Sequence, residues 1–125
     1  RQLYLAEPEG AADGARSFAK DALDHDFIPD TICDGLRGTL GAINFEILRT
    51  VDAQVLTIDD AQVVTAMRLL WTRTKQLVEP SSATALAAML ANRALFEGRR
   101  VGIILSGGNI DLDALPALFA TEAQP

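Results

Sequence analysis

The segment 101–116 constrains the fold of this chain more than any other stretch. Its apolar run 101–105, rich in β-branched and aliphatic residues, predicts a buried strand. Two glycines then allow a tight turn, and Asp111 is placed to cap a helix that follows. Ligands of open α/β sheets bind where strands end in such turns, so Ser106 and Asn109 mark the first candidate site.

Strand and helix patterns alternate along the rest of the chain. Short apolar runs predict strands at 3–6 and 53–58, and irregular composition predicts loops between 23 and 41. Amphipathic or apolar helix patterns cover 11–22, 43–51, 59–78, 80–94 and 112–119, the last interrupted or kinked by Pro116. This order favours an α/β fold with a largely parallel sheet.

The helix that starts after Asp59 has the strongest local signals. Asp59 and Gln62 have the spacing of a capping box, and Val63, Met67 and Leu70 recur on one face. Pro80 suits the first turn of the next helix, which is so rich in Ala, Leu and Met that we expect it to be buried. We expect that helix to stop before Gly98.

Four strand-like pieces at most are few for a sheet of this class, so we expect the chain to be part of a larger domain. Arg1 is not an initiator Met, and the first strand pattern begins two residues later, which we interpret as truncation. Hydrophobic residues make up 49% of the chain and its mean hydropathy is +0.16, so we expect missing chain or a partner to cover some of the surface.

Composition also argues against several classes of partner. A net charge of −6 disfavours binding to nucleic acid or anionic membranes, because both require basic patches. The single cysteine, Cys33, excludes an internal disulfide, and nothing resembles a signal peptide or a membrane-spanning run. These features predict a cytoplasmic protein with no nucleic-acid or membrane partner.

Four motifs together resemble one enzyme family. In chain order they are Ala-Glu-Pro-Glu-Gly-Ala-Ala-Asp (6–13), Asp-Thr-Ile-Cys-Asp-Gly-Leu-Arg (30–37), Val-Glu-Pro-Ser-Ser-Ala (78–83) and Leu-Ser-Gly-Gly-Asn-Ile-Asp-Leu (105–112). Their order and spacing are similar to those of the serine/threonine dehydratase and serine racemase family, pyridoxal-phosphate enzymes of the tryptophan-synthase-β-like fold (fold type II). The resemblance implies that 1–125 is the C-terminal portion of the large cofactor-binding domain, with a mostly parallel, three-layer sheet.

The resemblance implies where pyridoxal 5'-phosphate would bind. Ser106 would hydrogen-bond the pyridine nitrogen, Glu79 would lie near the pyridine edge, and Gly35, Gly107 and Asn109 would contribute to the same site. The Schiff-base lysine and the glycine-rich phosphate loop of the family have no match here, which implies that they lie in missing N-terminal sequence. We therefore assign no catalytic residue to this chain and expect it to be inactive by itself.

Each of these residues also has a simpler interpretation. Ser106 could merely end a strand, the glycines could merely turn the chain, and Glu79 could be a favourable charge at a helix N-terminus. Lys20 and Lys75 are not in the family's serine-x-lysine context, and Lys75 fits a solvated charge on its helix.

The first motif resembles the family's divalent-cation site. Glu7, the carbonyl of Ala11 and Asp13 would bind Mg²⁺ or another hard cation through oxygen atoms and water. Not all family members use the metal, and the two acids could instead form a solvated helix start.

The remaining reactive side chains have structural interpretations. Cys33 is expected to be a buried thiol and His25 a surface residue, because no histidine partner for the cysteine is evident. Met67 and Trp71 belong to a packing stripe.

The activity implied by the resemblance is a serine/threonine ammonia-lyase that forms a 2-oxo acid and ammonia by β-elimination. Serine racemase and hydroxyaspartate ammonia-lyase are the alternatives within the family. The substrate would be an amino acid, and the other partners would be the missing N-terminal segment and further copies in a dimer or tetramer. An alternative of another class is a non-catalytic module that binds a small ligand at the glycine turn.

Overall fold

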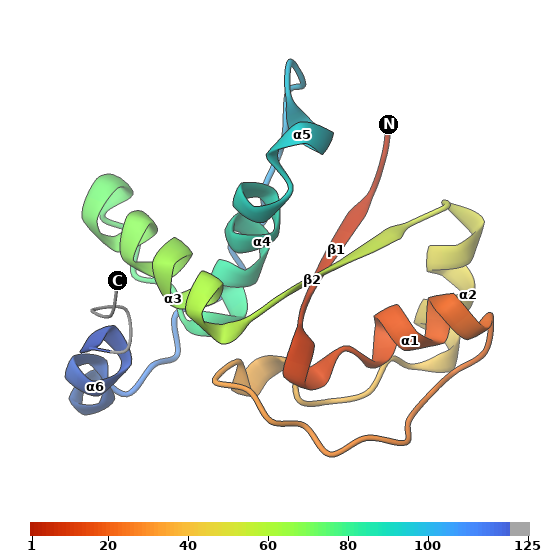
Figure 1. The fold of residues 1–125 in the computed structure, drawn as a ribbon, viewed down its shortest axis with the longest axis horizontal. Helices are drawn as coiled ribbons and strands as arrows, with labels where there is room; N and C mark the ends of the chain where they lie inside the picture. The colour runs from red at the N-terminus through yellow and green to blue at the C-terminus, as the bar shows by residue number, and fades with distance from the viewer. Residues whose placement is uncertain (121–125) are drawn as a thin grey trace.

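The computed structural model describes residues 1–120 as a small α/β arrangement built on two strands (Figure 1). β1 (Tyr4–Pro8) and β2 (Gln54–Ile58) pair in parallel, with Tyr4 opposite Gln54 and Pro8 opposite Ile58. The helices are α1 (Asp13–Lys20), α2 (Ala42–Thr50), α3 (Asp60–Leu69), α4 (Pro80–Ala91), α5 (Arg93–Phe96) and α6 (Leu115–Ala120). Short 3₁₀ turns cover Glu9–Ala11, Asp34–Leu36 and Leu112–Ala114.

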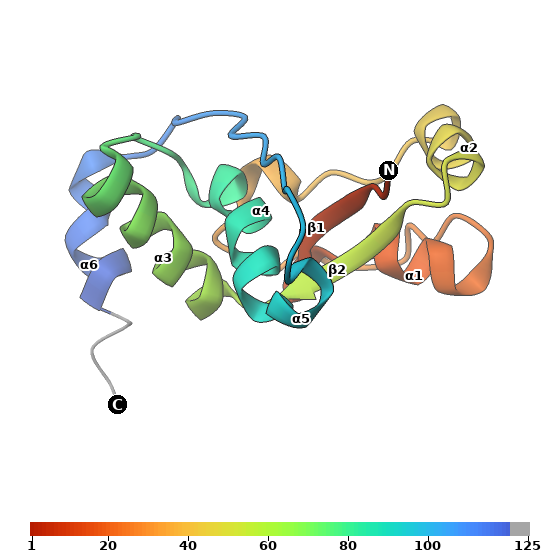
Figure 2. The same ribbon diagram turned by 90° about the horizontal axis from the view of Figure 1, so that it is seen from above.

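Helices cover the strand pair from two sides. α3 and α4 lie on one side of the strands, and α1 and α2 on the other (Figures 1 and 2). α4 packs against both strands and along α3, while α1 contacts β2. This confirms the predicted α/β class with a parallel sheet between helical layers.

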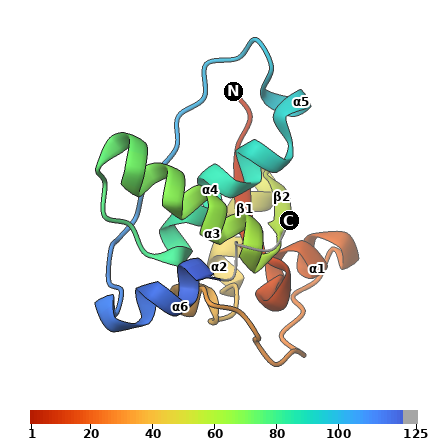
Figure 3. The same cartoon turned by 60° about the vertical axis from the view of Figure 1, so that its left-hand side comes forward.

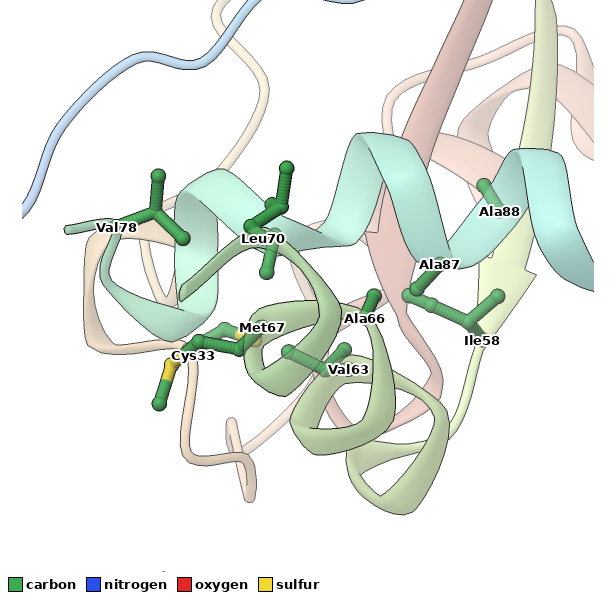
Figure 4. Close-up of a cluster of buried hydrophobic side chains, with 10 residues drawn as sticks. Cys33, Ile58, Val63, Ala66, Met67, Leu70, Val78, Ala87 and Ala88 are labelled. Carbon is green, nitrogen blue, oxygen red and sulfur yellow. The ribbon is translucent and has the colours of Figure 1, made fainter. Parts of the chain in front are cut away.

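The core lies where α4 meets α3 and the ends of the strands. Small side chains let the two helices approach closely, and Val63 and Met67 of α3 are fully buried between them (Figure 4). The buried cluster consists of Cys33, Ile58, Val63, Ala66, Met67, Leu70, Val78, Ala83, Ala87 and Ala88. The predicted packing stripe of α3 is therefore confirmed.

The N-terminus of α3 also anchors the long loop between α1 and α2. The Asp59 carboxylate accepts a hydrogen bond from Gln62 N at 2.7 Å, and Gln62 Oε1 accepts from Asp59 N at 3.0 Å, which confirms the capping box. The next residue, Asp60, accepts hydrogen bonds from Thr31 Oγ1 and from Ile32 N. The loop is thereby held against the core beside Cys33.

The C-terminal helix packs against α3 (Figure 3). The rings of Trp71 and Phe119 meet edge to face with 5.9 Å between their centroids, and Arg68 Nη2 donates to the Phe119 carbonyl at 2.7 Å. Trp71 Nε1 donates to the Val78 carbonyl, so this tryptophan joins α6 to the segment that precedes α4. Within residues 1–120, no helix has the length and apolar character needed to cross a membrane.

The strand predicted at 101–105 does not form. The segment is irregular, and Ile104 is 83% exposed. A strand requires a hydrogen-bonded neighbour, and β1 and β2 form a sheet of two strands within the described part of the chain. The apolar pattern is present, but no strand within residues 1–120 pairs with it.

Three helix ends differ from the predictions, and the predicted interruption at Pro116 is absent. α1 is shorter than 11–22 because Asp21 adopts a left-handed conformation, with φ of 53°. Lys75, with φ of 60°, likewise stops α3 and the π-helical turn Leu70–Thr74 before residue 78. The helix predicted to reach residue 94 breaks at Asn92 between α4 and α5. Pro116 causes no kink, because it lies in the first turn of α6, where its missing N–H costs no helical hydrogen bond.

Candidate functional site

The N-terminus of α4 gathers most of the residues that the sequence singled out. Pro80 occupies the first helical position, which leaves Glu79 as the N-cap residue with extended backbone. The Glu79 N–H donates to the Gly107 carbonyl at 3.1 Å. Ser82 is the third residue of the helix, and its Oγ accepts a hydrogen bond from Ser106 N at 3.0 Å. The turn at 106–107 is therefore fixed directly to the start of α4.

A second loop reaches the same helix turn. Gly35 N donates to Ser81 Oγ at 3.0 Å and to the side chain of Asp34 at 2.9 Å. Gly35 and Ser81 are 46 residues apart in the chain, so only the tertiary fold brings them together. The structure thus places four of the predicted cofactor-binding residues, at positions 35, 79, 106 and 107, around one helix N-terminus.

Two of these glycines lie where a side chain would collide with the site. A Cβ at Gly107 would lie 2.6 Å from Glu79 Oε1, and a Cβ at Gly35 would lie 3.0 Å from Ser81 Oγ. A Cβ at Gly108, the residue after Gly107, would lie 2.5 Å from the Leu77 carbonyl oxygen. The backbone therefore approaches α4 closely at 35 and 107, and glycine is required there because a side chain would displace Ser81 or Glu79.

Asn109 lies beside this arrangement and not within its hydrogen-bond network. It is exposed and lines a neighbouring pocket of about 440 Å³, together with Asp34 and Pro80. Ile110 and residues of α6 also line this pocket. A direct role of Asn109 at the ring stays a prediction.

Ser81 and Ser82 are functional candidates that the sequence analysis did not select. Both are buried, and each accepts a backbone N–H from a different loop of the site. The available signal was their position directly after Pro80, because residues there lie in the first turn of a helix. Their partners, however, are 24 and 46 residues away in the sequence, which no local pattern reveals.

Glu7 in β1 and Asp13, the first residue of α1, are the predicted cation ligands, and both accept hydrogen bonds from backbone groups. The Glu7 carboxylate accepts hydrogen bonds from Gly14 N at 3.1 Å and Ala15 N at 2.9 Å. The Asp13 carboxylate is 2% exposed and accepts from Leu40 N at 2.6 Å. The Glu7 carboxylate thus stabilises the N-terminus of α1, as the simpler interpretation suggested. The expected solvated start is wrong for Asp13, which is buried.

Burial raises the pKa of Glu7, and the negative charge of Asp13 raises it further, against the two backbone donors. A cation would stabilise these two acids, of which Asp13 is buried and Glu7 is partly buried. Ala11, whose carbonyl completes the predicted set, lies in the 3₁₀ turn between them and is 1% exposed. Across residues 1–120, no three His, Cys, Asp or Glu side chains gather as a metal site. A cation bound here would therefore rely on two carboxylates, a carbonyl and water.

Cys33 and His25 have the structural roles that were predicted. Cys33 is fully buried, and burial raises the pKa of its thiol to about 11. His25 is exposed, and its Nε2 lies 3.0 Å from the Leu40 carbonyl oxygen. Lys75 is also exposed and donates to the Thr72 carbonyl, in agreement with its interpretation as a solvated charge.

The chain matches known proteins over most of its length. A family model described as "Pyridoxal-phosphate dependent enzyme" matches residues 1–107. The chain is 42% identical over 115 residues to the beta-hydroxyaspartate dehydratase of Paracoccus denitrificans, and the match covers 92% of this chain and 36% of that protein.

Two solved structures are similar in both sequence and fold. Maize serine racemase has a TM-score of 0.85 and 37% identity, covering 96% of this chain and 38% of the maize chain. The threonine deaminase of T.th. has a TM-score of 0.78 and 38% identity, covering 89% of this chain and 41% of that protein. The chain thus spans well under half the length of the relatives that it matches.

Proposed function

Because the chain belongs to the family of pyridoxal-phosphate-dependent enzymes, we propose that it is the C-terminal portion of the large cofactor-binding domain of an amino-acid ammonia-lyase. The proposed reaction is β-elimination from a serine- or threonine-type substrate, which gives a 2-oxo acid and ammonia. The observation that carries the proposal is the convergence of Gly35, Glu79 and the turn at 106–107 on the N-terminus of α4.

The residues present fit the nitrogen end of the cofactor ring. Ser106 is exposed, and the glycines at 35 and 107 let two loops approach Ser81 and Glu79 at the start of α4 closely. When bound, pyridoxal phosphate supplies an electron sink for the substrate's α-carbon. A neutral hydroxyl at position 106 would leave the ring nitrogen largely unprotonated, whereas a carboxylate there would hold a proton on it. The weaker sink favours rapid loss of a β-hydroxyl over transamination.

We propose that sequence outside these 125 residues supplies the lysine and the phosphate loop. Support comes from a groove of about 580 Å³ between β1 and the segment 99–104, lined by Tyr4, Leu5 and Ile104 among others. The edge of β1 away from β2 has no strand partner within residues 1–120, and the segment 101–105 has the composition of a strand without a ladder. Further strands of a longer protein would pair with both and complete the sheet.

Two further parts of the proposal concern a cation and self-association. Glu7, Ala11 and Asp13 would hold Mg²⁺ or a similar divalent cation through oxygen atoms.

Ile43, Ile47 and Val51 lie on one face of α2 and its C-terminus and are 50–77% exposed, which supports coverage of α2 in a dimer or tetramer. We assign the whole protein to the cytoplasm.

Hydroxyaspartate is the second candidate substrate. The beta-hydroxyaspartate dehydratase of Paracoccus denitrificans is 42% identical to this chain. Elimination from either substrate removes a hydroxyl group from the β-carbon, so the site described here serves both reactions. Serine racemase is the remaining alternative. Its reaction would need an additional acid to reprotonate the α-carbon, and we propose that this acid would come from sequence outside this chain.

The test uses the complete protein that contains this chain, purified with pyridoxal phosphate. We expect a visible cofactor absorbance band, and release of a 2-oxo acid and ammonia from serine, threonine or 3-hydroxyaspartate. Chiral chromatography of serine after incubation measures racemisation in the same sample. Cofactor binding with racemisation and no 2-oxo acid would favour the racemase. A protein without cofactor absorbance or turnover would favour a non-catalytic ligand-binding module.

A variant tests the role of the neutral hydroxyl directly. In the complete enzyme, Ser106→Asp should retain the cofactor but lower the rate of elimination by at least about tenfold, because a carboxylate keeps the ring nitrogen protonated. Cofactor absorbance and 2-oxo acid release are the measurements. Unchanged turnover would mean that the neutrality of Ser106 is unimportant.

A further inference from the structure

The turn that carries Ser106 is held at two points by one turn of α4. Ser106 N donates to Ser82 Oγ, and the Gly107 carbonyl accepts from Glu79 N. These bonds fix the peptide group before Ser106 and the peptide group after Gly107. The two α-carbons between them, and therefore the direction of the Ser106 side chain, are set by the position of α4.

Ser82 is a rigid acceptor, whereas Ser106 lies on an irregular segment. Ser82 is 2% exposed in the first turn of a 12-residue helix that packs on both strands and on α3. Residues 101–110 form neither helix nor strand, and Ser106 is exposed. The order of the turn at 106–107 therefore comes from its bonds to the helix and not from a local ladder of its own.

We infer that Ser82 is a positioning residue, which aims Ser106 at the ring nitrogen of the cofactor. The inference rests on the proposed function. Ser82 acts through the backbone of Ser106, so its removal should misplace the hydroxyl of Ser106 while leaving that hydroxyl present. Loss of one hydrogen bond shifts the equilibrium between an ordered and a disordered turn by about tenfold. Because only the ordered turn presents the Ser106 hydroxyl correctly, we expect cofactor affinity to fall by up to about that factor.

The chain offers a matched control for the loss of a buried serine. Ser17 in α1 is fully buried, and its Oγ accepts a backbone N–H from Asp24 at 2.9 Å. Ser17→Ala therefore removes the same type of bond from α1, which lies on the other side of the strands from α4 (Figure 1). Ser82→Thr retains a hydroxyl at the site and tests for rescue.

The experiment compares Ser82→Ala, Ser82→Thr and Ser17→Ala in the complete enzyme. We expect Ser82→Ala to raise the Kd for pyridoxal phosphate about tenfold and to shift the absorbance maximum of the bound cofactor, with recovery in Ser82→Thr. Ser17→Ala should lower Tm while leaving Kd and the absorbance maximum unchanged. Equal loss of Tm in both alanine variants, with unchanged Kd and spectrum, would reduce Ser82 to a structural residue and overturn the inference.

Two additions keep the test decisive. If Ser82→Ala does not fold, Ser82→Cys keeps a side chain of similar size with a weak acceptor and takes its place in the same measurements. Hydrogen exchange of the Ser106 amide needs no cofactor, and it should be slow in the wild-type protein and faster in the Ser82 variant. A wild-type protein that binds no cofactor would contradict the proposed function, whereas unchanged Ser106 exchange would contradict this inference separately.

Discussion

At the scale of single residues, the three glycines near the end of the chain differ in what surrounds them. A Cβ at Gly107 meets the end of the Glu79 side chain, which can rotate away, whereas a Cβ at Gly108 meets the backbone carbonyl of Leu77 at 2.5 Å. A Cβ at Gly102 would have no atom within 4 Å. The destabilisation caused by a glycine-to-alanine substitution should therefore be largest at Gly108, smaller at Gly107 and smallest at Gly102.

We predict that Gly108→Ala lowers the free energy of unfolding by about 2–3 kcal/mol, because the backbone of the segment before α4 would have to move. Gly107→Ala should cost less than about 1 kcal/mol, since a flexible side chain gives way. Gly102→Ala should be neutral or stabilising by a few tenths of a kcal/mol. Urea unfolding of the three variants measures the series, and equal costs at 107 and 108 would contradict the packing described here.

The thiol of Cys33 should be unreactive in the native protein. Its pKa is raised to about 11 by burial, so only about one thiol in a thousand is ionised at about pH 8. We predict slow alkylation by iodoacetamide that accelerates as the pH rises toward 11, because the thiolate is the nucleophile. Labelling in urea provides the control and should be fast. Rapid labelling of the folded protein would show that the segment around Cys33 opens.

At the scale of elements, helix starts are set by local chemistry and helix ends by backbone conformation. The capping box of Asp59 and Gln62 starts α3 as predicted, because both bonds connect residues three apart. The ends of α1 and α3 came earlier than predicted, because Asp21 and Lys75 adopt left-handed conformations. Apolar periodicity does not encode such stops, since it continues past them.

We predict that Asp59→Ala destabilises the protein by about 1 kcal/mol through the loss of its helix cap. Gln62→Ala should lower stability less, because the Asp59 carboxylate would still accept the backbone N–H of residue 62. The double variant should cost less than the sum of the two, since the bonds belong to one reciprocal motif. Thermal or urea unfolding measures all three, and strict additivity would mean that the two side chains act independently.

At the scale of the whole molecule, α6 connects the C-terminal segment to the core through Trp71. This residue is the sole tryptophan of the sequence, so its fluorescence reports on the contact with Phe119. We predict that Phe119→Ala shifts the Trp71 emission to longer wavelength and lowers stability by about 1–2 kcal/mol, because an edge-to-face partner is lost. Leu112→Ala is the control, since Leu112 is 65% exposed and should leave the emission unchanged. Unchanged emission in Phe119→Ala would contradict the packing of α6 on Trp71.

Much of the fold followed from local signals. The strands at the start of the chain and after Ala53, the capped α3 with its buried stripe, and Pro80 at the start of α4 were all predicted from residues close in sequence. The motif Ser-Gly-Gly-Asn and the Glu-Pro pair also marked the region where the candidate site lies. The helix cap and the helix starts involve contacts within one or two turns, which the sequence by itself determines, whereas the strands have only a local pattern and pair with residues 50 positions away.

Only the tertiary structure decided how these pieces meet. Ser82 and Ser81 became candidates because their hydroxyls accept N–H groups from 24 and 46 residues away. The apolar run 101–105 did not become a strand within residues 1–120, because strand formation depends on a neighbouring backbone. Helices and caps are determined locally, whereas ladders and converging loops depend on partners distant in sequence, and the candidate site of this protein is built from the second kind of contact.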